Sequence, residues 1–230
     1  MSVPLVLLGC GYTLTRLALR EAAQGREVLA TTRDAARRAL LEAAGVEVLA
    51  LDEALASTAG AHVVISVPPE AGLDARLAAA LSTRPSARSV YLSSTGVYGT
   101  ARGVVDEDTP VDPVAGAGRL AAEALLRPLG ACILRVAGIY GPGRGAHSRL
   151  LSGQLRLPQG GGGRISRIHV DDLVSAVQCV LARGTPGAVY CAADDHPACQ
   201  GETVGWLCER LGVARPPEVP LAELHASLRG

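Results

Sequence analysis

Residues 3–15, VPLVLLGCGYTLT, contain the pattern from which we infer the fold of the whole chain. Residues 3–8 form an apolar run that is too short for a helix and stops at a glycine, which is typical of a buried parallel strand. A tight turn is expected at residues 9–11, and residues 12–23 carry apolar side chains at helical spacing. A strand, a glycine turn and a helix in this order predict a dinucleotide site, because bare glycines let the backbone approach a pyrophosphate and the helix N-terminus attracts its charge.

The turn departs at one position from the full dinucleotide-binding fingerprint. Leu14 occupies the place of the third glycine, which permits close packing of the helix on the strand. We therefore expect the turn to lie slightly further from the strand. An ordinary strand–helix turn has the same local pattern, and we favour a nucleotide site because of the motifs that follow. The cofactor contacts expected in this turn are Gly9, Cys10, Gly11, Tyr12, Thr13 and Leu14.

The next part of the chain alternates strands and helices. Strands are expected at residues 27–32, 46–51, 61–67, 89–94 and 131–136, and helices at residues 34–44, 52–57, 72–81 and 118–126, with Asp34 as the cap of the first. This alternation predicts an α/β fold with a doubly wound parallel sheet, Rossmann-like in architecture. Ligands of such sheets bind beyond the carboxyl ends of the strands. Gly9, Arg33, Pro68 and Ser94 follow or end strands, so we expect them to face one crevice.

After Val136 the regular alternation is lost. Residues 138–163 are rich in glycine and predict a mobile loop. A helix is expected at 171–181, a strand at 188–192, a helix at 203–211, and a short amphipathic piece in the tail at 216–230. We therefore expect a dinucleotide-binding core at 1–136. Residues 137–230 would form substrate-side loops and a small C-terminal substrate lobe, with 164–192 partly returning to the core.

The charge of the chain is balanced, because 22 basic residues face 22 acidic ones. This balance argues against a nucleic-acid partner or an anionic membrane held by bulk charge. No apolar run reaches the roughly 18 residues of a membrane span, and no basic segment precedes the first apolar run, so we expect no membrane contact, no signal peptide and a cytoplasmic location. All 22 basic residues are arginines, so no reaction of this chain can use a lysine amine.

The six cysteines form no C-x-x-C pair, and most lie in apolar surroundings. Free buried thiols are therefore expected, rather than a disulfide framework or a metal site. Cys10 lies beside a helix N-terminus, which can lower the pKa of a thiol. We favour the simpler interpretation that Cys10 is a small residue filling a tight turn.

Six stretches in separate parts of the chain suggest one family. They are LLGCGYTL at 7–14, VYLSSTGVYG at 90–99, LAAEALL at 120–126, ILRVAGIYGPG at 133–143, RIHVDDL at 167–173 and YCAADDHPA at 190–198. In their order and spacing the chain resembles the extended short-chain dehydrogenase/reductase superfamily, of the NAD(P)-dependent epimerase/dehydratase kind. The resemblance covers nearly the whole chain. It implies a bound NAD or NADP and oxidoreductase or epimerase chemistry on a nucleotide sugar or a similar small polar substrate.

The chain departs from the family pattern at the catalytic pair. The family places a catalytic tyrosine four residues before a lysine, just ahead of a helix resembling residues 120–126. Here Ala115 stands in the place of the tyrosine and Arg119 in the place of the lysine. Arg119 could still donate hydrogen bonds to ribose hydroxyls, with a permanent charge and a different geometry. The chain thus looks like the atypical branch whose members are named sugar-nucleotide epimerases, with a degenerate active site.

The remaining catalytic candidates are hydroxyl groups. Ser94 matches the family's catalytic serine or threonine, and its hydroxyl would bond a substrate carbonyl or hydroxyl, unless the backbone already satisfies it. Thr95 is the second choice. Tyr98 and Tyr140 are the phenols expected near the cleft, although packing under a loop with a satisfied hydroxyl is the favoured interpretation of both. Arg119 completes this set.

Two further groups of residues are expected to contact the cofactor. Thr32 and Arg33 end the second strand without an acidic residue, which suits a 2′-phosphate, so NADP is preferred over NAD. The alternative is a solvated arginine before a helix cap. Val67, Pro68 and Pro69 would form a stiff wall at the adenosine side, or simply terminate the strand.

Beyond the core, Arg144 is preferred over Arg135 as the group that binds a substrate phosphate or carboxylate. His169, Asp171 and Asp172 invite a metal or acid–base interpretation. We expect instead that Asp171 caps a helix, that His169 packs between layers, and that no metal is bound.

Two functions remain open at this point. Loss of both catalytic positions favours a catalytically silent NAD(P)-binding sensor or regulatory module. Retention of Ser94 and of the substrate-side loops favours an enzyme, whose activity we expect to be a hydride transfer that needs little acid–base help. In either case the expected partner is a small molecule, and the chain is a monomer or a homodimer.

Overall fold

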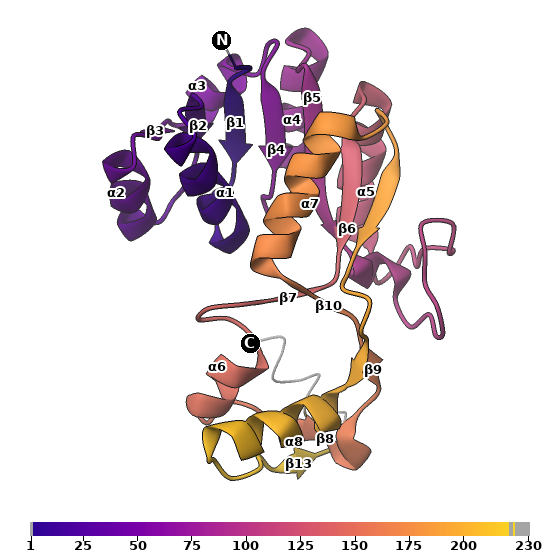
Figure 1. The fold of residues 1–230 in the computed structure, drawn as a ribbon. Helices are drawn as coiled ribbons and strands as arrows, with labels where there is room; N and C mark the ends of the chain where they lie inside the picture. Colours follow the sequence, from indigo (N-terminus) through magenta and orange to yellow (C-terminus); the bar gives the residue numbers. More distant parts are fainter. Residues whose placement is uncertain (1, 221–222, 224–230) are drawn as a thin grey trace. The chain divides into compact units, whose positions relative to one another are not determined.

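The computed structural model describes residues 2–220 and 223. Within them, one seven-stranded parallel sheet has the order β11-β6-β5-β4-β1-β2-β3 (Figure 1). Its strands are β1 (Leu5–Leu8), β2 (Val28–Ala30), β3 (Glu47–Val48), β4 (His62–Ile65), β5 (Arg88–Ser94), β6 (Cys132–Val136) and β11 (Val189–Ala192). The expected doubly wound α/β fold is confirmed.

Helices cover both faces of the sheet (Figure 1). One layer contains α3 (Leu51–Ala56), α4 (Ala71–Thr83) and α5 (Ala117–Leu126), with α4 packed against both neighbours. The other layer contains α1 (Tyr12–Ala23), α2 (Ala35–Ala43) and α7 (Val170–Arg183). Arg20 of α1 donates hydrogen bonds to Ser175 and Gln178 of α7, which ties the late helix to the first one.

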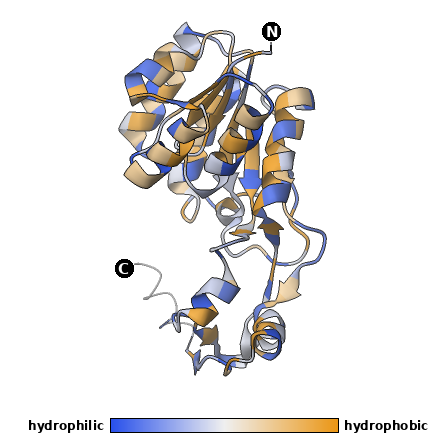
Figure 2. Cartoon of the chain, turned by 60° about the vertical axis from the view of Figure 1, so that its left-hand side comes forward, coloured by the Kyte–Doolittle hydropathy of each residue, from blue (hydrophilic) through white to orange (hydrophobic). Residues whose placement is uncertain are grey.

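The side chains of the central strands alternate between the two helix layers. In β1, Val6 and Leu8 join a core with Ile65 and Tyr91 under α3, α4 and α5. Leu5 and Leu7 of the same strand are buried too, and they point to the opposite face. Figure 2 shows hydrophobic residues concentrated in these strands. Because both faces are covered, β1 is a continuous apolar run in the sequence.

The chain forms two compact units. Residues 1–136 and 171–192 make up the first unit, and residues 137–170 and 193–230 make up the second. The first unit contains the central sheet. The second has a small core of its own, formed by Leu150, Leu155, Leu157, Val204 and Cys208.

The loop expected at residues 138–163 was a wrong prediction in part, because short regular elements occur there. Leu150, Leu155 and Leu157 find apolar partners on α8, and such distant partners are invisible to a local glycine signal. The elements of the second unit are β7 (Gly138–Tyr140), α6 (Ala146–Leu151), β8 (Leu157–Pro158), η3 (Gln159–Gly161), β9 (Arg164–Ile165), β10 (Arg167–His169), β12 (Ala198–Cys199), α8 (Gln200–Leu211) and β13 (Glu218–Val219). The amphipathic piece expected in the tail lies largely outside the described residues.

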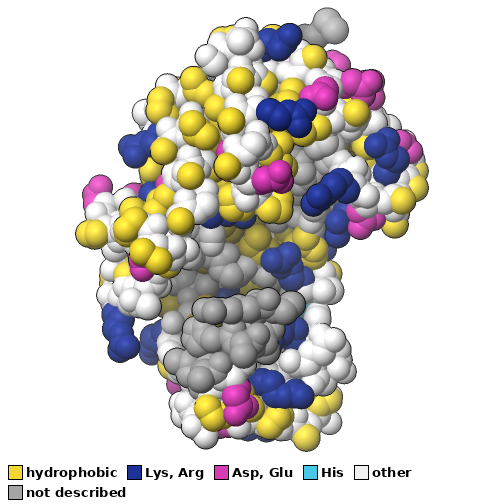
Figure 3. Space-filling model, turned by 180° about the vertical axis from the view of Figure 1, so that it is seen from behind, with side chains coloured by type: hydrophobic (Ala, Val, Ile, Leu, Met, Phe, Trp, Pro, Cys, Tyr) yellow, Lys and Arg dark blue, Asp and Glu magenta, His cyan; other side chains and the backbone are white. Residues whose placement is uncertain are grey.

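The outer face of the α4 and α5 layer exposes several small apolar side chains. Ala75, Ala79, Ala121, Ala124 and Leu125 are exposed there. Figure 3 shows many hydrophobic side chains on this side of the first unit. Among the helices of the described residues, none is long and apolar enough to cross a membrane.

Candidate functional site

The site begins at Gly9, which ends β1 and must be a glycine. Its φ is +91°, a region that side-chain-bearing residues rarely adopt. A Cβ added there would lie 2.8 Å from Cγ1 of Val67 and 3.1 Å from the carbonyl carbon of Ser66. The turn therefore presses its backbone against the residues that follow β4, and Leu14 in place of a third glycine does not prevent this close approach.

Gly11 is a glycine for a different reason. It is the N-cap residue of α1, its φ of −95° is open to other residues, and an added Cβ would meet nothing within 4 Å. The first helical hydrogen bond runs from the amide of Thr15 to the carbonyl of Gly11. The amides of Thr13 and Leu14 come before it and have no acceptor within the helix. The open space and these amides together form a cradle of the kind that can accept an anion at a helix N-terminus.

Cys10 faces the interior and not the cradle. Its side chain is buried, and its amide donates to the carbonyl of Thr31 at 2.7 Å. Burial raises the pKa of the Cys10 thiol to about 12, although the charge of Arg37 opposes this shift. The thiol is therefore protonated at neutral pH and acts as the small filler residue that we favoured.

Thr31, at the hydroxylated end of the second strand, holds the turn in place. The amide of Gly9 donates to Oγ1 of Thr31 at 2.9 Å, and the threonine is buried. This bond links the ends of β1 and β2. The sequence signal was a hydroxyl residue directly after a strand, but the partner lies 22 residues away.

The end of β2 combines a hydroxyl with two arginines. Asp34 caps α2 as expected, since its Oδ1 accepts from the Arg37 amide at 3.0 Å, and its own amide donates to Oγ1 of Thr32 at 3.2 Å. Arg33 is exposed. Nη1 of Arg37 lies 3.3 Å from Oδ2 of Asp34, and its charge reaches Cys10 in the turn. Arg37 is thus a second basic group at this strand end, which sequence reasoning missed.

Val67, Pro68 and Pro69 follow β4 and lie between the glycine turn and α5. Val67 contacts Gly9 as described. On the other side, a Cβ added to Gly118 would lie 3.3 Å from Cβ and Cγ of Pro69, so the start of α5 packs directly on the proline. The three residues therefore form a wall in the first unit that ends at α5.

Arg119 is anchored at the carboxyl ends of two strands. Its Nη1 lies 3.0 Å from both the Tyr91 hydroxyl and the Leu92 carbonyl oxygen, and 3.4 Å from the Val67 carbonyl oxygen. The guanidinium carbon is 5.7 Å from the centroid of the Tyr91 ring. This cation therefore lies at the same sheet edge as the glycine turn. Ala115, one turn earlier, is exposed.

The segment before α5 is fixed by Asp112. Its Oδ1 accepts hydrogen bonds from the amides of Val114 and Ala115, at 2.8 and 3.0 Å. These bonds lower the pKa of Asp112. The backbone at position 115, where the family carries its tyrosine, is thus held in a defined turn.

Ser94 and Thr95 lie at the end of β5. Ser94 caps the short 3-10 helix η1 (Thr95–Tyr98), because its hydroxyl accepts from the Gly96 amide at 3.1 Å. The hydroxyl keeps its own proton for donation. Oγ1 of Thr95 donates to the carbonyl of Val136 at 3.4 Å. Ser94 therefore remains the better placed hydroxyl to serve a ligand.

Tyr98 belongs to a buried polar network and is 4% exposed. Its hydroxyl accepts from Nη1 of Arg135 at 3.0 Å and lies 3.2 Å from Sγ of Cys191. Nη2 of Arg135 lies 2.8 Å from Oε2 of Glu123, and Ser93 donates to Oε1 of the same glutamate at 2.5 Å. Burial, together with the bond to Cys191, raises the pKa of Tyr98 to about 12 in spite of Arg135. The phenol is packed and satisfied, as the favoured interpretation had it.

Tyr140 and Arg144 belong to the second unit. The Tyr140 ring meets the His169 ring edge-on, with centroids 5.3 Å apart. Arg144 lies in a tight turn in which its amide and carbonyl exchange hydrogen bonds with Gly141. The expectation that Asp171 caps a helix was wrong, since α7 begins at Val170 and Asp171 lies inside its first turn. An acidic residue there still favours the helix dipole.

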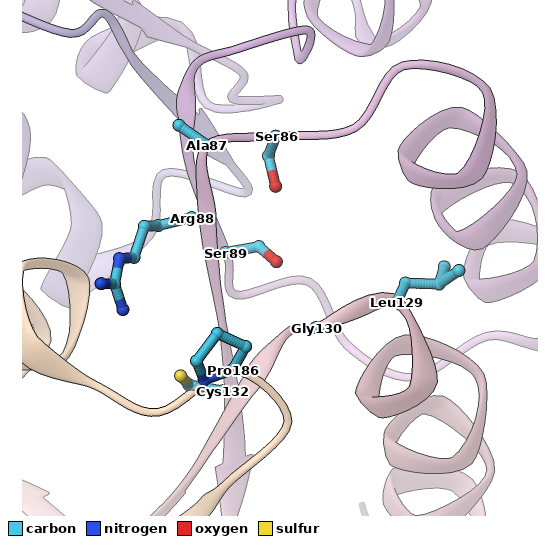
Figure 4. Close-up of a pocket in the computed structure, with 8 residues that line it drawn as sticks. All are labelled: Ser86, Ala87, Arg88, Ser89, Leu129, Gly130, Cys132 and Pro186. Carbon is cyan, nitrogen blue, oxygen red and sulfur yellow. The ribbon is translucent and has the colours of Figure 1, made fainter.

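A cavity of about 240 Å³ lies at the opposite, amino-terminal end of the sheet strands. Figure 4 shows Ser86 and Ser89 beside Gly130 and Pro186 at its wall, while the Arg88 guanidinium turns away and donates to the Gly184 carbonyl. None of the predicted site residues lines this cavity. The candidate site is therefore the sheet edge that carries Gly9, and not this cavity.

Comparison with known proteins supports the cofactor interpretation of this edge. The family described as NAD dependent epimerase/dehydratase matches residues 11–193, and the chain belongs to this family. The resemblance drawn from the motifs is thereby confirmed. The match establishes the family of this chain, whose model is described by NAD-dependent chemistry, and it names no particular substrate.

Two solved structures have the same fold. A conserved protein of unknown function from Silicibacter pomeroyi DSS is 34% identical, with a TM-score of 0.82, and the match covers 96% of this chain and 83% of that one. MoeE5, solved in complex with UDP-glucose and NAD, is 23% identical, with a TM-score of 0.78, over 94% of this chain and 84% of that one. At 23% identity the second match shows the fold alone.

Two curated relatives match about half of the chain. Protein YeeZ of Escherichia coli K12 is 37% identical over 117 residues, which are 48% of this chain and 42% of YeeZ. A 3-diazoavenalumate denitrifying reductase from Streptomyces sp is 34% identical over 138 residues, which are 52% of this chain and 44% of the reductase. Each match thus spans less than half the length of the relative.

Proposed function

We propose that this chain is an NAD(P)-dependent oxidoreductase or epimerase-like protein that acts on a nucleotide sugar or a similar small polar substrate. The observation that carries the proposal is the cradle at Gly11, which is open above the N-terminus of α1 while Gly9 is pressed against the end of β4. Such a cradle fits a pyrophosphate. The NAD and UDP-glucose bound to MoeE5 support the same classes of cofactor and substrate.

Each part of this sheet edge has a role in the proposal. The amides of Thr13 and Leu14, with the open space at Gly11, would hold the pyrophosphate. Gly9, Cys10 and Tyr12 would shape the turn, since the Gly9 and Cys10 amides are bonded to Thr31. Val67, Pro68 and Pro69 would line the adenosine side. Arg119 would donate to ribose hydroxyls, and Ser94 would donate its remaining proton to a substrate oxygen. The bound dinucleotide would supply the hydride donor or acceptor. Arg144 is the candidate for a substrate phosphate or carboxylate.

NADP is the preferred cofactor in this proposal. Thr32, Arg33 and Arg37 present a hydroxyl and two guanidinium groups at the end of β2, where an NAD-specific site carries an acid. The acid that is present, Asp34, is engaged as a helix cap. A 2′-phosphate would gain charge-assisted hydrogen bonds from the arginines.

The reaction would depend little on acid–base catalysis. Ala115 supplies no phenol, and a pKa of about 12 leaves the Tyr98 proton too firmly held for a general base at neutral pH. A hydride transfer to a polarised substrate, with protons exchanged through Ser94 or water, makes smaller demands. The Streptomyces relative is named a reductase, which supports this direction.

A catalytically silent NAD(P) sensor or regulatory module is the second candidate. The exposed Ala115 and the engaged Tyr98 favour it, because neither can replace the missing catalytic tyrosine. A silent module would bind the cofactor with the same residues and turn over no substrate. A partner would then recognise the liganded chain. The chain itself would be a monomer or a homodimer.

The test is an activity screen with common nucleotide sugars and small carbonyl compounds in the presence of NAD, NADH, NADP or NADPH. We expect slow or absent epimerisation by the wild type, and measurable reduction with NADPH. A double variant, Ala115→Tyr with Arg119→Lys, should gain epimerase activity if the site is otherwise intact. Brisk epimerisation by the wild type would contradict the expectation that the reaction depends little on acid–base catalysis, and Tyr98→Phe and Tyr140→Phe would then show which phenol is used.

A further inference from the structure

Asp74 of α4 is a buried carboxylate that the proposed function does not explain. Its side chain is 2% exposed. Oδ2 accepts from the Glu70 amide at 3.1 Å and closes the first turn of α4. Oδ1 is buried and has no hydrogen-bond partner among the described residues. A buried carboxylate oxygen without a partner is unfavourable, and an apolar residue would avoid this cost, so its presence calls for a reason.

Arg119 is the charged residue with the largest effect on the pKa of Asp74. Burial raises the pKa of Asp74, while the Glu70 amide and the Arg119 charge lower it. Tyr91, which is fully buried, behaves in parallel, because burial raises its pKa and the hydrogen bond from Arg119 lowers it. Arg119 bonds Tyr91 directly, and Asp74 lies on α4, which packs against the helix that carries Arg119. We call these three residues the Arg119 cluster.

The geometry of the Arg119 cluster leaves one side of the guanidinium for another partner. The hydrogen bonds to Val67, Tyr91 and Leu92 all use Nη1. Since a guanidinium is planar and rigid, fixing Nη1 fixes the directions in which Nε and Nη2 donate. An arginine held in this way enters a complex with little further ordering.

We propose that Asp74 and Tyr91 are positioning residues that hold Arg119 in the conformation in which it binds the cofactor ribose. This inference rests on the proposed function, because it presumes that a dinucleotide occupies the sheet edge. Tyr91 fixes Nη1 through its hydroxyl and its ring, and Asp74 supplies a buried counter-charge to the guanidinium. The two residues would thus hold an arginine in place at the position where the family carries its lysine.

Affinity and stability should respond to these residues in opposite directions. Asp74→Asn keeps an oxygen for the Glu70 amide and removes the buried charge, so the melting temperature should be no lower than that of the wild type. If Asp74 acted only by repelling the anionic dinucleotide, this variant would bind the dinucleotide more tightly than the wild type. If Asp74 positions Arg119, the variant should bind the dinucleotide more weakly, by threefold or more. A residue with a merely structural role would lower stability and affinity together.

The experiment is a calorimetric titration of the full chain with NADPH and NADH, accompanied by thermal unfolding. Arg119→Ala should weaken binding at least tenfold, and Asp74→Asn and Tyr91→Phe should each weaken it threefold or more. In the Arg119→Ala background, Asp74→Asn and Tyr91→Phe should each change the affinity by less than twofold, because there is no longer a guanidinium to position. Asp52→Asn, on the exposed Asp52–Arg76 pair, is the matched charge control and should bind as the wild type does.

The outcomes separate this inference from the proposed function. Additive losses in the double variants, tighter binding by Asp74→Asn, or unchanged binding by Arg119→Ala would overturn the positioning role, while the cofactor site itself would stand if Gly11→Val still abolished binding. A wild type that binds no dinucleotide would overturn the proposed function and this inference with it.

Discussion

At the scale of single residues, Gly9 and Gly11 show that two glycines in one turn can have unrelated purposes. Gly9 has a φ of +91° and no room for a Cβ, so it serves the fold. Gly11 has an ordinary φ and open space in front of it, so the fold does not require a glycine there, and we propose that the space admits a ligand. A sequence motif treats both glycines alike and does not show this difference. Substitutions at the two positions therefore test the candidate site directly.

We predict opposite effects for substitutions at these two positions. Gly9→Ala should cost about 1–3 kcal/mol of unfolding free energy, because a side chain is forced into the left-handed region against Val67. Gly11→Val should cost less than about 1 kcal/mol, since its Cβ meets nothing, but it should abolish cofactor binding by filling the cradle. Urea unfolding and calorimetry measure the two quantities. Unchanged cofactor affinity in Gly11→Val would show that the pyrophosphate site is elsewhere.

A second prediction at this scale concerns Arg33. Removing its guanidinium by Arg33→Ala should weaken NADPH binding about tenfold, or about 1.4 kcal/mol, and leave NADH binding nearly unchanged. Arg38→Ala is the matched control, because Arg38 donates to Glu42 of its own helix α2 and to the Val48 carbonyl of the neighbouring strand β3. Equal affinities of the wild type for NADPH and NADH would contradict the predicted preference for NADP.

At the scale of elements, one buried network joins four strands and helices of the first unit. Glu123 of α5 and Arg135 of β6 are both 7% exposed at the side chain, and they reach Ser93 of β5 and Tyr98 of η1. Burial would by itself lower the pKa of Arg135, but the bonds to Glu123 and Tyr98 raise it instead. Because Ser93 adjoins Ser94, the network also fixes the strand end that carries the candidate hydroxyl.

Breaking this network at one end should be costly. Glu123→Gln leaves the buried Arg135 charge uncompensated and should lower the free energy of unfolding by about 3–5 kcal/mol. The double variant Glu123→Leu with Arg135→Met removes both charges and should lose clearly less, even though Ser93 and Tyr98 also lose partners. Chemical denaturation of the three proteins checks this. If the double variant is as unstable as Glu123→Gln, the loss comes from removing the ion pair itself and not from leaving the Arg135 charge without a partner.

At the scale of the whole molecule, stability should fall in mild acid because of His62. Its Nδ1 lies 2.9 Å from Nη2 of Arg26, which is a donor, so the ring accepts and is neutral. Burial lowers the pKa of His62, and the charges of Arg26 and Arg88 lower it further, while Glu21 opposes them. The unfolded chain therefore takes up the proton first as the pH falls.

The sign of the effect follows from this order of protonation. The contribution of His62 is fully present above its unfolded pKa of about 6.5, and it is lost as the pH falls from there through the lower folded value. The slope can reach about 1.4 kcal/mol per pH unit for one proton. Unfolding free energies between pH 7.5 and 5 should show this slope in the wild type and a flatter profile in His62→Gln. Parallel profiles would exclude His62 as the source.

Much of the first unit was determined by the sequence alone, because its signals are local. The apolar run of β1, the helical spacing of α1, whose expected bounds of 12–23 match Tyr12–Ala23, and the Asp34 cap each depend on residues a few positions apart. The same local signals place Gly9, Pro68 and Ser94 at strand ends. Parallel strands bring such ends to one edge, so the position of the site followed from the fold class.

Only the tertiary structure decided which of these residues serve the fold and which stay available to a ligand. Thr31 holds Gly9 from 22 residues away, and Arg119 is anchored by Tyr91, 28 residues away, with the Asp74 charge at hand. Likewise, the Tyr98 hydroxyl is satisfied by a hydrogen bond from Arg135 of β6 and not by a loop. Such partners meet through crossovers that no local pattern encodes. The burial that turns an unpaired oxygen or an open cradle into a functional signal exists only once the chain has folded.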